Sequence, residues 1–172
     1  DAVNYLHQAG YKKTILLVEN RITMFERKRI QGFQSATALM NTDVTENFIV
    51  ECGTESSQID EALQNMLNHC EDIDSIICTN NVVAYETLKF LKKKKLDVPG
   101  DIGIITFDNY PLAEYMDPPL TVVDIDTYKL GEEAANILFS IIQNPGQDRK
   151  EVLLSTRIIE RESTMKGEKR KK

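Results

Sequence analysis

Three polar side chains stand where apolar runs of this sequence end, and their types suit hydrogen bonding to a ligand. Asp108 and Asn80 each directly follow a short apolar run, and Arg29 lies in the helical segment after a third run. The carboxyl ends of parallel strands meet at one edge of a sheet, where open α/β folds bind ligands. A guanidinium, an amide and a carboxylate can each engage adjacent hydroxyl groups. The set therefore favours a polyhydroxylated ligand.

The same positions also have purely structural interpretations. Asn81 can cap the helix that follows it, and this role is favoured for it over ligand binding. Asp108 can anchor a turn, because aspartate side chains hydrogen-bond nearby backbone groups. The spacing alone leaves both roles of Asp108 open.

Residues for covalent or metal chemistry lack the spacing that such chemistry needs. Cys52, Cys70 and Cys78 have no metal-ligand spacing and indicate reduced thiols in a cytoplasmic protein. His7 and His69 stand in no recognisable nucleophile motif. The sequence also has no glycine-rich phosphate loop. We therefore predict no catalytic residue, no metal and no cofactor, and a protein that is not an enzyme.

Composition indicates a globular protein of ordinary size. The chain has 172 residues, of which 41% are hydrophobic and 28% charged, with a formal net charge of −6. A nucleic-acid-binding face is usually basic, so this chain is not expected to contact DNA itself. Its dense basic runs, 92–95 and 169–172, are interpreted as the solvated end of a helix and a tail. No apolar run approaches the roughly 20 residues that a membrane span needs.

Hydrophobic periodicity predicts helices and strands in alternation. Strands separated by helices of this length imply right-handed crossovers and a parallel sheet covered on both faces, which is an α/β fold. Ser56 or Ser57 is expected to cap the third helix. Helices are expected at 1–9, 21–40, 57–68, 81–95 and 128–143, and strands at 14–18, 48–52, 75–79, 102–107, 121–125 and 152–160.

A series of motifs follows one order along the chain: GYKKTILL, RKRIQGF, TNNVVAYETLKFL, VPGDIGIITFDN, PPLTVV, LGEEAANIL and RIIERES. With these motifs, residues 1 to about 164 resemble the LacI/GalR family of bacterial transcription regulators. The family implies a type I periplasmic-binding-protein-like domain, with two similar α/β subdomains and a sugar, sugar acid or related small metabolite in the cleft between them. It also implies a helix-turn-helix headpiece, expected upstream of this chain, that binds operator DNA as a dimer.

The resemblance also implies a division of the chain. The hinge between the subdomains is expected at Asp124, Ile125 and Asp126. The implied parts are 10–123 and 151–164 for the C-terminal subdomain, 1–9 and 126–144 for pieces of the N-terminal subdomain, and 165–172 for a disordered basic tail.

Four residues match effector contacts of the family: Arg29, Asp108, Asn80 and Phe25. Phe25 stands where some members have a polar contact and others an aromatic ring that stacks on a sugar. Arg27, near Arg29, would suit an acidic sugar, although a solvent-facing Arg27 is at least as compatible with the sequence. The departures from the family pattern are Asn81 for an aspartate, Thr106 for a glycine and Ile125 for a common glutamine, and they affect the identity of the ligand more than the fold.

An apolar stretch after Asp108 matches the family's dimer contact. An exposed apolar segment is expected at an interface, although the stretch could instead fold onto its own core. The predicted interface comprises Tyr85, Leu88, Tyr110, Leu112, Tyr115 and Met116.

The leading hypothesis is therefore the effector-sensing and dimerisation domain of a cytoplasmic repressor. Its partners would be a small-molecule effector, a second copy of the chain and, through the headpiece, operator DNA. A periplasmic-type sugar-binding protein of a transport system has the same fold and is the alternative. An α/β enzyme is a third class, disfavoured by the missing nucleophile and base. The upstream sequence would separate the first two, because one requires a helix-turn-helix and the other an export signal.

Overall fold

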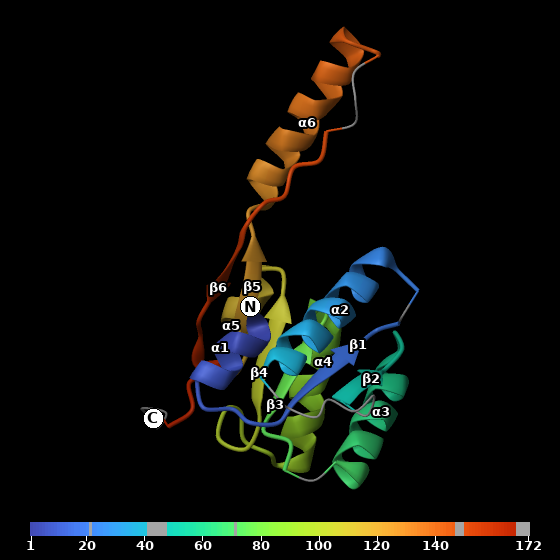
Figure 1. Ribbon diagram of the computed structural model, residues 1–172. Coiled ribbons are helices and arrows are strands. Elements are labelled where there is room, and N and C mark those ends of the chain that lie inside the picture. The colour runs from blue at the N-terminus through green and yellow to red at the C-terminus, as the bar shows by residue number, and fades with distance from the viewer. Residues whose placement is uncertain (21, 41–47, 71, 147–149, 168–172) are drawn as a thin grey trace.

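The computed structural model describes residues 1–20, 22–40, 48–70, 72–146 and 150–167 as one six-stranded sheet with helices on both faces (Figure 1). Residues 168–172 of the predicted basic tail lie outside the described residues. In chain order the elements are α1 (Ala2–Gln8), β1 (Thr14–Val18), α2 (Met24–Leu39), β2 (Ile49–Glu51), α3 (Ser56–His69), β3 (Ser75–Cys78), α4 (Asn81–Lys94), β4 (Gly103–Phe107), α5 (Leu112–Tyr115), β5 (Thr121–Ile125), α6 (Thr127–Gln143), β6 (Thr156–Ile159) and the 3-10 helix η2 (Glu162–Thr164).

The sheet has the order β2-β1-β3-β4-β5-β6, and it is mixed rather than wholly parallel. Strands β1 to β5 pair in parallel, as predicted. Strand β6 instead pairs antiparallel with β5, with Val122 opposite Ile159. The chain leaves the sheet after β5, passes through α6 and returns beside its exit, so β6 must run back in the opposite direction (Figure 1). The strand expected at 152–160 is also shorter, covering Thr156–Ile159.

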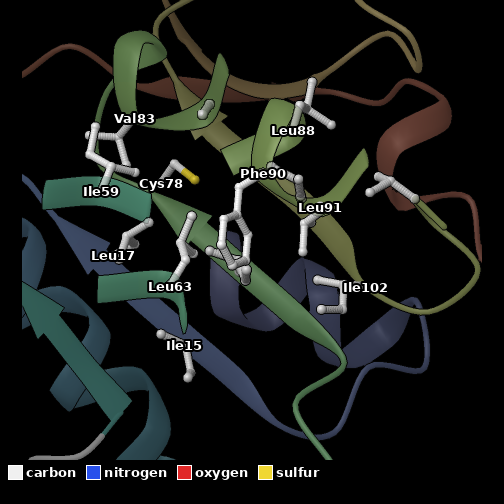
Figure 2. Packing of buried hydrophobic residues seen from close by; sticks show 14 of the residues in the cluster. Ile15, Leu17, Ile59, Leu63, Cys78, Val83, Leu88, Phe90, Leu91 and Ile102 are labelled. Atoms are coloured by element: carbon white, nitrogen blue, oxygen red, sulfur yellow. The ribbon is translucent and has the colours of Figure 1, made fainter. Parts of the chain in front are cut away.

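Two hydrophobic clusters fill the two faces of the sheet. Ile15 and Leu17 of β1 pack against α3 and α4, whereas Leu16 and Val18 pack against α1 and α2. This division follows from the two-residue period of a strand. Figure 2 shows the first cluster, in which Phe90 of α4 lies among leucines and isoleucines of the neighbouring elements. Apolar residues on both faces explain why the strands are near-continuous hydrophobic runs.

Helix α1 belongs to the sheet body. Ala2, Val3 and Leu6 are buried in the same cluster as Leu16 and Phe33. The expectation that residues 1–9 form a piece of the other subdomain is therefore corrected. Packing decides this point, because a short amphipathic helix at a chain end can cover any adjacent apolar face.

Helix α6 projects away from the sheet (Figure 1). It has no buried residue in the described chain, although its sequence is strongly amphipathic. Leu138, Phe139 and Ile142 are all exposed. An apolar helix face of this kind requires a covering surface that the described residues do not supply. None of the described helices is both long enough and apolar enough to span a membrane.

The helix caps differ from the sequence-based expectation by one residue. Asn80, not Asn81, caps α4, because its Oδ1 accepts a hydrogen bond from the backbone N–H of Val83 at 2.9 Å. Glu55 precedes α3, and its backbone N–H donates to Oε1 of Gln58 at 3.1 Å. Neither Ser56 nor Ser57 is the cap. The shift moves Asn81 into the first turn of α4, where its side chain is buried.

Hydrogen bonds of Arg161 and Ser163 hold η2 against the sheet. Ser163 is fully buried, and its hydroxyl donates to the carbonyl of Ile104 at 2.6 Å and accepts from the N–H of Thr121 at 2.8 Å. Arg161 donates through its guanidinium to the carbonyl of Leu120 at 2.8 Å and to Oδ1 of Asn109 at 2.8 Å. These bonds tie the chain end to β4, to β5 and to the turn after Asp108.

Candidate functional site

Arg29 and Asp108 come together at the carboxyl edge of the sheet. Nη2 of Arg29 lies 3.9 Å from Oδ2 of Asp108, and its Nη1 donates to the carbonyl of Thr79. The guanidinium carbon lies 4.3 Å from the centroid of the Phe107 ring, a cation–π distance. Helix α2 therefore places Arg29 over the ends of β3 and β4. Sequence reasoning identified Arg29 and Asp108 but missed Phe107, which appeared only as the last residue of a strand.

Asp108 lies at a bend directly after β4. Its φ of 68° lies in the left-handed region, which non-glycine residues seldom adopt, although aspartate tolerates it better than most. Its backbone N–H donates to the carbonyl of Val123 at 2.9 Å. The side chain remains half-buried and is turned to Arg29. The two roles that the sequence left open, turn residue and site carboxylate, are thus compatible in one residue.

Asn80 lies at the same edge with both ends of its amide engaged. Its Oδ1 caps α4, and its Nδ2 donates to Oε2 of Glu19 at 2.9 Å. Glu19 directly follows the last residue of β1, so the carboxyl ends of β1 and β3 are linked by this bond. The amide has a second N–H, which could donate to a ligand.

Glu26 is a buried carboxyl that sequence reasoning missed. It is only 5% exposed, and its Oε1 accepts a hydrogen bond of 2.8 Å from the hydroxyl of Thr79. Its Oε2 has no hydrogen-bond partner among the described residues. Burial raises the pKa of Glu26, an effect that the Thr79 bond and the nearby Arg29 charge partly oppose. Thr79 therefore connects Glu26, through its hydroxyl, to Arg29, through its carbonyl.

The predicted aromatic contact at Phe25 is not part of this group. Phe25 is 69% exposed and lines neither depression described below, because helix α2 turns Glu26 inward and Phe25 outward. Arg27 is also turned away: its Nη2 donates to the carbonyl of Ile22 at 2.7 Å on the exposed side of the helix. The solvent-facing interpretation of Arg27 therefore holds.

Two depressions flank the Arg29–Asp108 pair. A groove of about 730 Å³ is lined by Asn80, Asp108 and residues of α4 and the 110–112 segment. A smaller hollow of about 280 Å³ lies over α1 and α2 and is lined by Arg29 and Phe107. Of the predicted effector residues, Asn80 and Asp108 thus line one concave surface, Arg29 lines the other, and Phe25 lines neither.

Residues 3–164 match the sequence model of a periplasmic binding protein-like domain. The chain belongs to this family. Its relatives include the HTH-type transcriptional repressors PurR of Vibrio cholerae (28% identical over 162 residues) and CytR of Escherichia coli (29% over 164), and the regulator MalR of Clostridium butyricum (30% over 162). These alignments cover 94–95% of this chain and 48% of each relative. The chain therefore spans about half the length of the curated relatives it matches.

Solved structures give the same result. A LacI regulator from Bacillus cereus superposes with a TM-score of 0.86 at 25% identity, covering 94% of this chain and 57% of that one. CcpA of Lactococcus lactis superposes with a TM-score of 0.82 at 25% identity, covering 94% and 59%. A CelR–cellobiose complex, at 21% identity, shares the fold with a TM-score of 0.84 and coverage of 92% and 49%. The resemblance to LacI/GalR regulators and the α/β fold class are both confirmed.

The predicted hinge lies where this periplasmic-binding-protein-like chain leaves its sheet. Asp124 of β5 accepts from Nε of Arg157 of β6 at 2.9 Å, and the two residues are paired in the strand register. Ile125 pairs with Thr156, and Oδ1 of Asp126 caps α6 by accepting from the N–H of Lys129 at 2.9 Å. The two connections between the sheet and α6 therefore pass through the ends of β5 and β6, which the Asp124–Arg157 contact joins.

The six residues expected at a dimer interface divide into two groups. Tyr110, Leu112 and Tyr115 are exposed. Leu88 is only 6% exposed in the core between α4 and the sheet, so little of its side chain is left for a contact with a second copy. Met116 is half-buried against the same core, and Tyr85 is half-buried as well. Helix phase causes this division, because Leu88 lies on the face of α4 that packs inward.

Cys52 and Cys78 are buried thiols. Burial raises the pKa of Cys52 and of Cys78 to about 12, so both stay protonated at neutral pH and are poor nucleophiles. Among the described residues, no group of three His, Cys, Asp or Glu side chains is placed to hold a metal ion.

Proposed function

We propose that this chain is the effector-sensing domain of a LacI-type transcriptional repressor. A small molecule bound at the carboxyl edge of the sheet controls operator binding by a DNA-binding segment outside this chain. The observation that carries the proposal is the Arg29–Asp108 pair over Phe107, at the sheet edge where α/β folds bind ligands. The relatives named above are transcription regulators, which favours this function over a solute-binding one.

The second wall of the effector site would come from another subdomain. Helix α6 supports this, because its apolar face is exposed and both of its connections pass through the Asp124–Arg157 segment. Residues 126–144 would then belong to that subdomain, and Asp124, Ile125 and Asp126 would form the hinge. A ligand that contacts both subdomains would favour one relative orientation and so alter the placement of the DNA-binding segments.

The effector would be a sugar or a related small metabolite. Arg29, Asp108 and Asn80 supply donors and acceptors for adjacent hydroxyl groups. Because Arg27 is turned to the Ile22 carbonyl, it does not supply the second cation that an acidic sugar would favour. The CelR–cellobiose structure shows that a protein of this fold is found in complex with a disaccharide.

The regulator would act as a homodimer in the cytoplasm, because two headpieces must meet two operator half-sites. Tyr110, Leu112 and Tyr115 are the exposed members of the expected interface. Together with the half-buried Tyr85 and Met116 they form the surface that we assign to the second copy.

The test uses the full-length protein. A thermal-shift screen of neutral sugars and sugar acids identifies an effector, since a ligand that binds the folded state raises its melting temperature. Arg29→Ala and Asp108→Ala should abolish the response to that effector while operator binding is retained. Arg27→Ala is the matched control, because its side chain faces solvent, and it should respond normally. Unchanged effector affinity in both site variants, measured by calorimetry, would refute the assignment.

A further inference from the structure

The buried carboxyl of Glu26 is held beside the guanidinium of Arg29. The two residues are three positions apart in α2, so they share one face of the helix. Both also hydrogen-bond the same residue at the end of β3: the hydroxyl of Thr79 donates to Oε1 of Glu26 at 2.8 Å, and its carbonyl accepts from Nη1 of Arg29. Because Thr79 is fully buried, this shared partner fixes the position of both side chains.

Glu26 and Asp108 differ in how strongly water screens their interaction with Arg29. The Asp108 side chain is 38% exposed, and its Oδ2 lies 3.9 Å from Nη2 of Arg29, so this pair is weakened by solvent. Glu26 is only 5% exposed, and its charge is screened much less. Lys28 lines the same hollow as Arg29, but it is exposed. Of these charged groups, Glu26 is therefore expected to act most strongly on a ligand at the guanidinium.

The surroundings of Glu26 support its ionised form. A buried carboxylate is stable only where a positive charge or hydrogen-bond donors face it. Burial raises the pKa of Glu26, whereas the Thr79 hydroxyl and the Arg29 charge oppose that rise. Its Oε2 has no hydrogen-bond partner among the described residues, so the nearby guanidinium is its main electrostatic support there. By the same interaction, Glu26 balances the charge of Arg29.

A guanidinium with a buried counter-ion has less to gain from an anionic ligand. Attraction between Arg29 and a ligand carboxylate or phosphate would be opposed by repulsion from Glu26, across a region that water screens weakly. The hydroxyl groups of a neutral ligand meet no such repulsion and can still accept from the N–H groups of Arg29. Repulsion against the wrong ligand is a common basis of specificity.

We propose that Glu26 is a specificity-determining residue of the effector site, which makes Arg29 select a neutral polyhydroxylated effector over one that carries a carboxylate or a phosphate. The inference rests on the proposed function and adds to it the class of the effector. Sequence reasoning had left sugars and sugar acids equally open.

The test uses inorganic phosphate as an anionic probe on the full-length protein, so that it does not depend on an identified effector. Phenylglyoxal modifies accessible guanidinium groups, and an anion bound to Arg29 should block the reaction, which is followed at this residue by peptide mass spectrometry. The phosphate concentration that protects half of Arg29 should be at least about tenfold lower in Glu26→Gln than in the wild type. Glu26→Met removes the charge without adding an N–H group and should show the same shift.

Two controls separate this effect from a general change of charge or structure. Glu61→Gln removes one acid from an exposed position of α3 and should match the wild type within about twofold. Arg27 lies on the exposed side of α2, and its modification should respond to phosphate equally in every variant. The melting temperature of each variant shows whether it is folded, and either of the two Glu26 variants suffices for the comparison.

Two results would overturn the proposal. One is equal protection of Arg29 by phosphate in the wild type and the folded Glu26 variants, including no protection in any of them. The other is a sugar acid as the wild-type effector in the thermal-shift screen. An unchanged effector response of Arg29→Ala would instead refute the proposed function, while the phosphate measurement would still report whether Glu26 controls charge selectivity at Arg29.

Discussion

The hydroxyl of Thr79 donates a hydrogen bond of 2.8 Å to Oε1 of the buried Glu26, while the carbonyl of Thr79 accepts from Arg29. One residue at the end of β3 therefore links a buried carboxyl to the guanidinium of the candidate effector site. A change in the ionisation of Glu26 is expected to reach Arg29 through this residue, and also directly, because the Arg29 charge acts on the carboxyl.

Replacing Glu26 with glutamine should change how stability depends on pH. The pKa of Glu26 in the folded chain is raised above its ordinary value of 4.5, mainly by burial. The folded state then holds this proton more tightly than the unfolded state, so wild-type stability falls as the pH rises from 4.5 through the raised pKa. Glu26→Gln lacks the titrating group and should lose this decline, as measured by urea unfolding across that range.

The matched control for this prediction is Glu61→Gln, an exposed position of α3. This variant should show the same fall in stability with rising pH as the wild type. If Glu26→Gln also keeps it, Glu26 is not the group responsible.

Gly103→Ala should destabilise the fold. A Cβ at this position would lie 2.4 Å from the ring of Tyr11, which is itself fully buried and cannot move aside cheaply. Overpacking of this kind costs about 1–3 kcal/mol. Gly32→Ala, where a Cβ meets nothing within 4 Å, should instead be neutral or stabilise α2 by up to about 1 kcal/mol. Equal melting temperatures for the two variants would contradict the clash.

Ser163→Ala should release η2 from the sheet. The substitution removes two hydrogen bonds and leaves the Ile104 carbonyl and the Thr121 N–H buried without this partner. A cost of about 1–3 kcal/mol is expected, measured by chemical unfolding. The exposed helical Ser57→Ala serves as control and should stay within about 0.5 kcal/mol of wild type. A Ser163 variant as stable as this control would show that the two bonds contribute little.

Charged residues at Leu112 and Tyr115 should weaken self-association of the full-length protein. Both side chains are exposed, Tyr115 at 80%, so the substitutions Leu112→Glu and Tyr115→Glu spare the core. Sedimentation should show monomers, since burying an unpaired charge at an interface is costly. Leu39→Glu, exposed at the end of α2, is the control and should remain associated. A dimeric double variant would place the interface elsewhere.

Much of the sheet could be predicted from the sequence, because its signals are local. Short β-branched runs that are apolar at every position indicate strands buried on both faces, and the helices between them imply parallel pairing. The pairing of Arg29 with Asp108 could be expected on the same basis, since both follow strands whose carboxyl ends share an edge. Glu26 could not be found in this way, because a glutamate beside a phenylalanine predicts the opposite orientation of the helix.

The sequence by itself determined the family, the order of the elements and the edge at which Arg29, Asn80 and Asp108 meet. Only the tertiary structure decided the direction of β6 and the cap at Asn80. It also decided the rotation of α4, which places Leu88 in the core, and the rotation of α2, which places Phe25 in solvent. The physical reason is the same in each case. Apolar runs and caps are properties of neighbouring residues, whereas the rotation of a helix and the direction of a returning strand depend on surfaces that are distant in the chain.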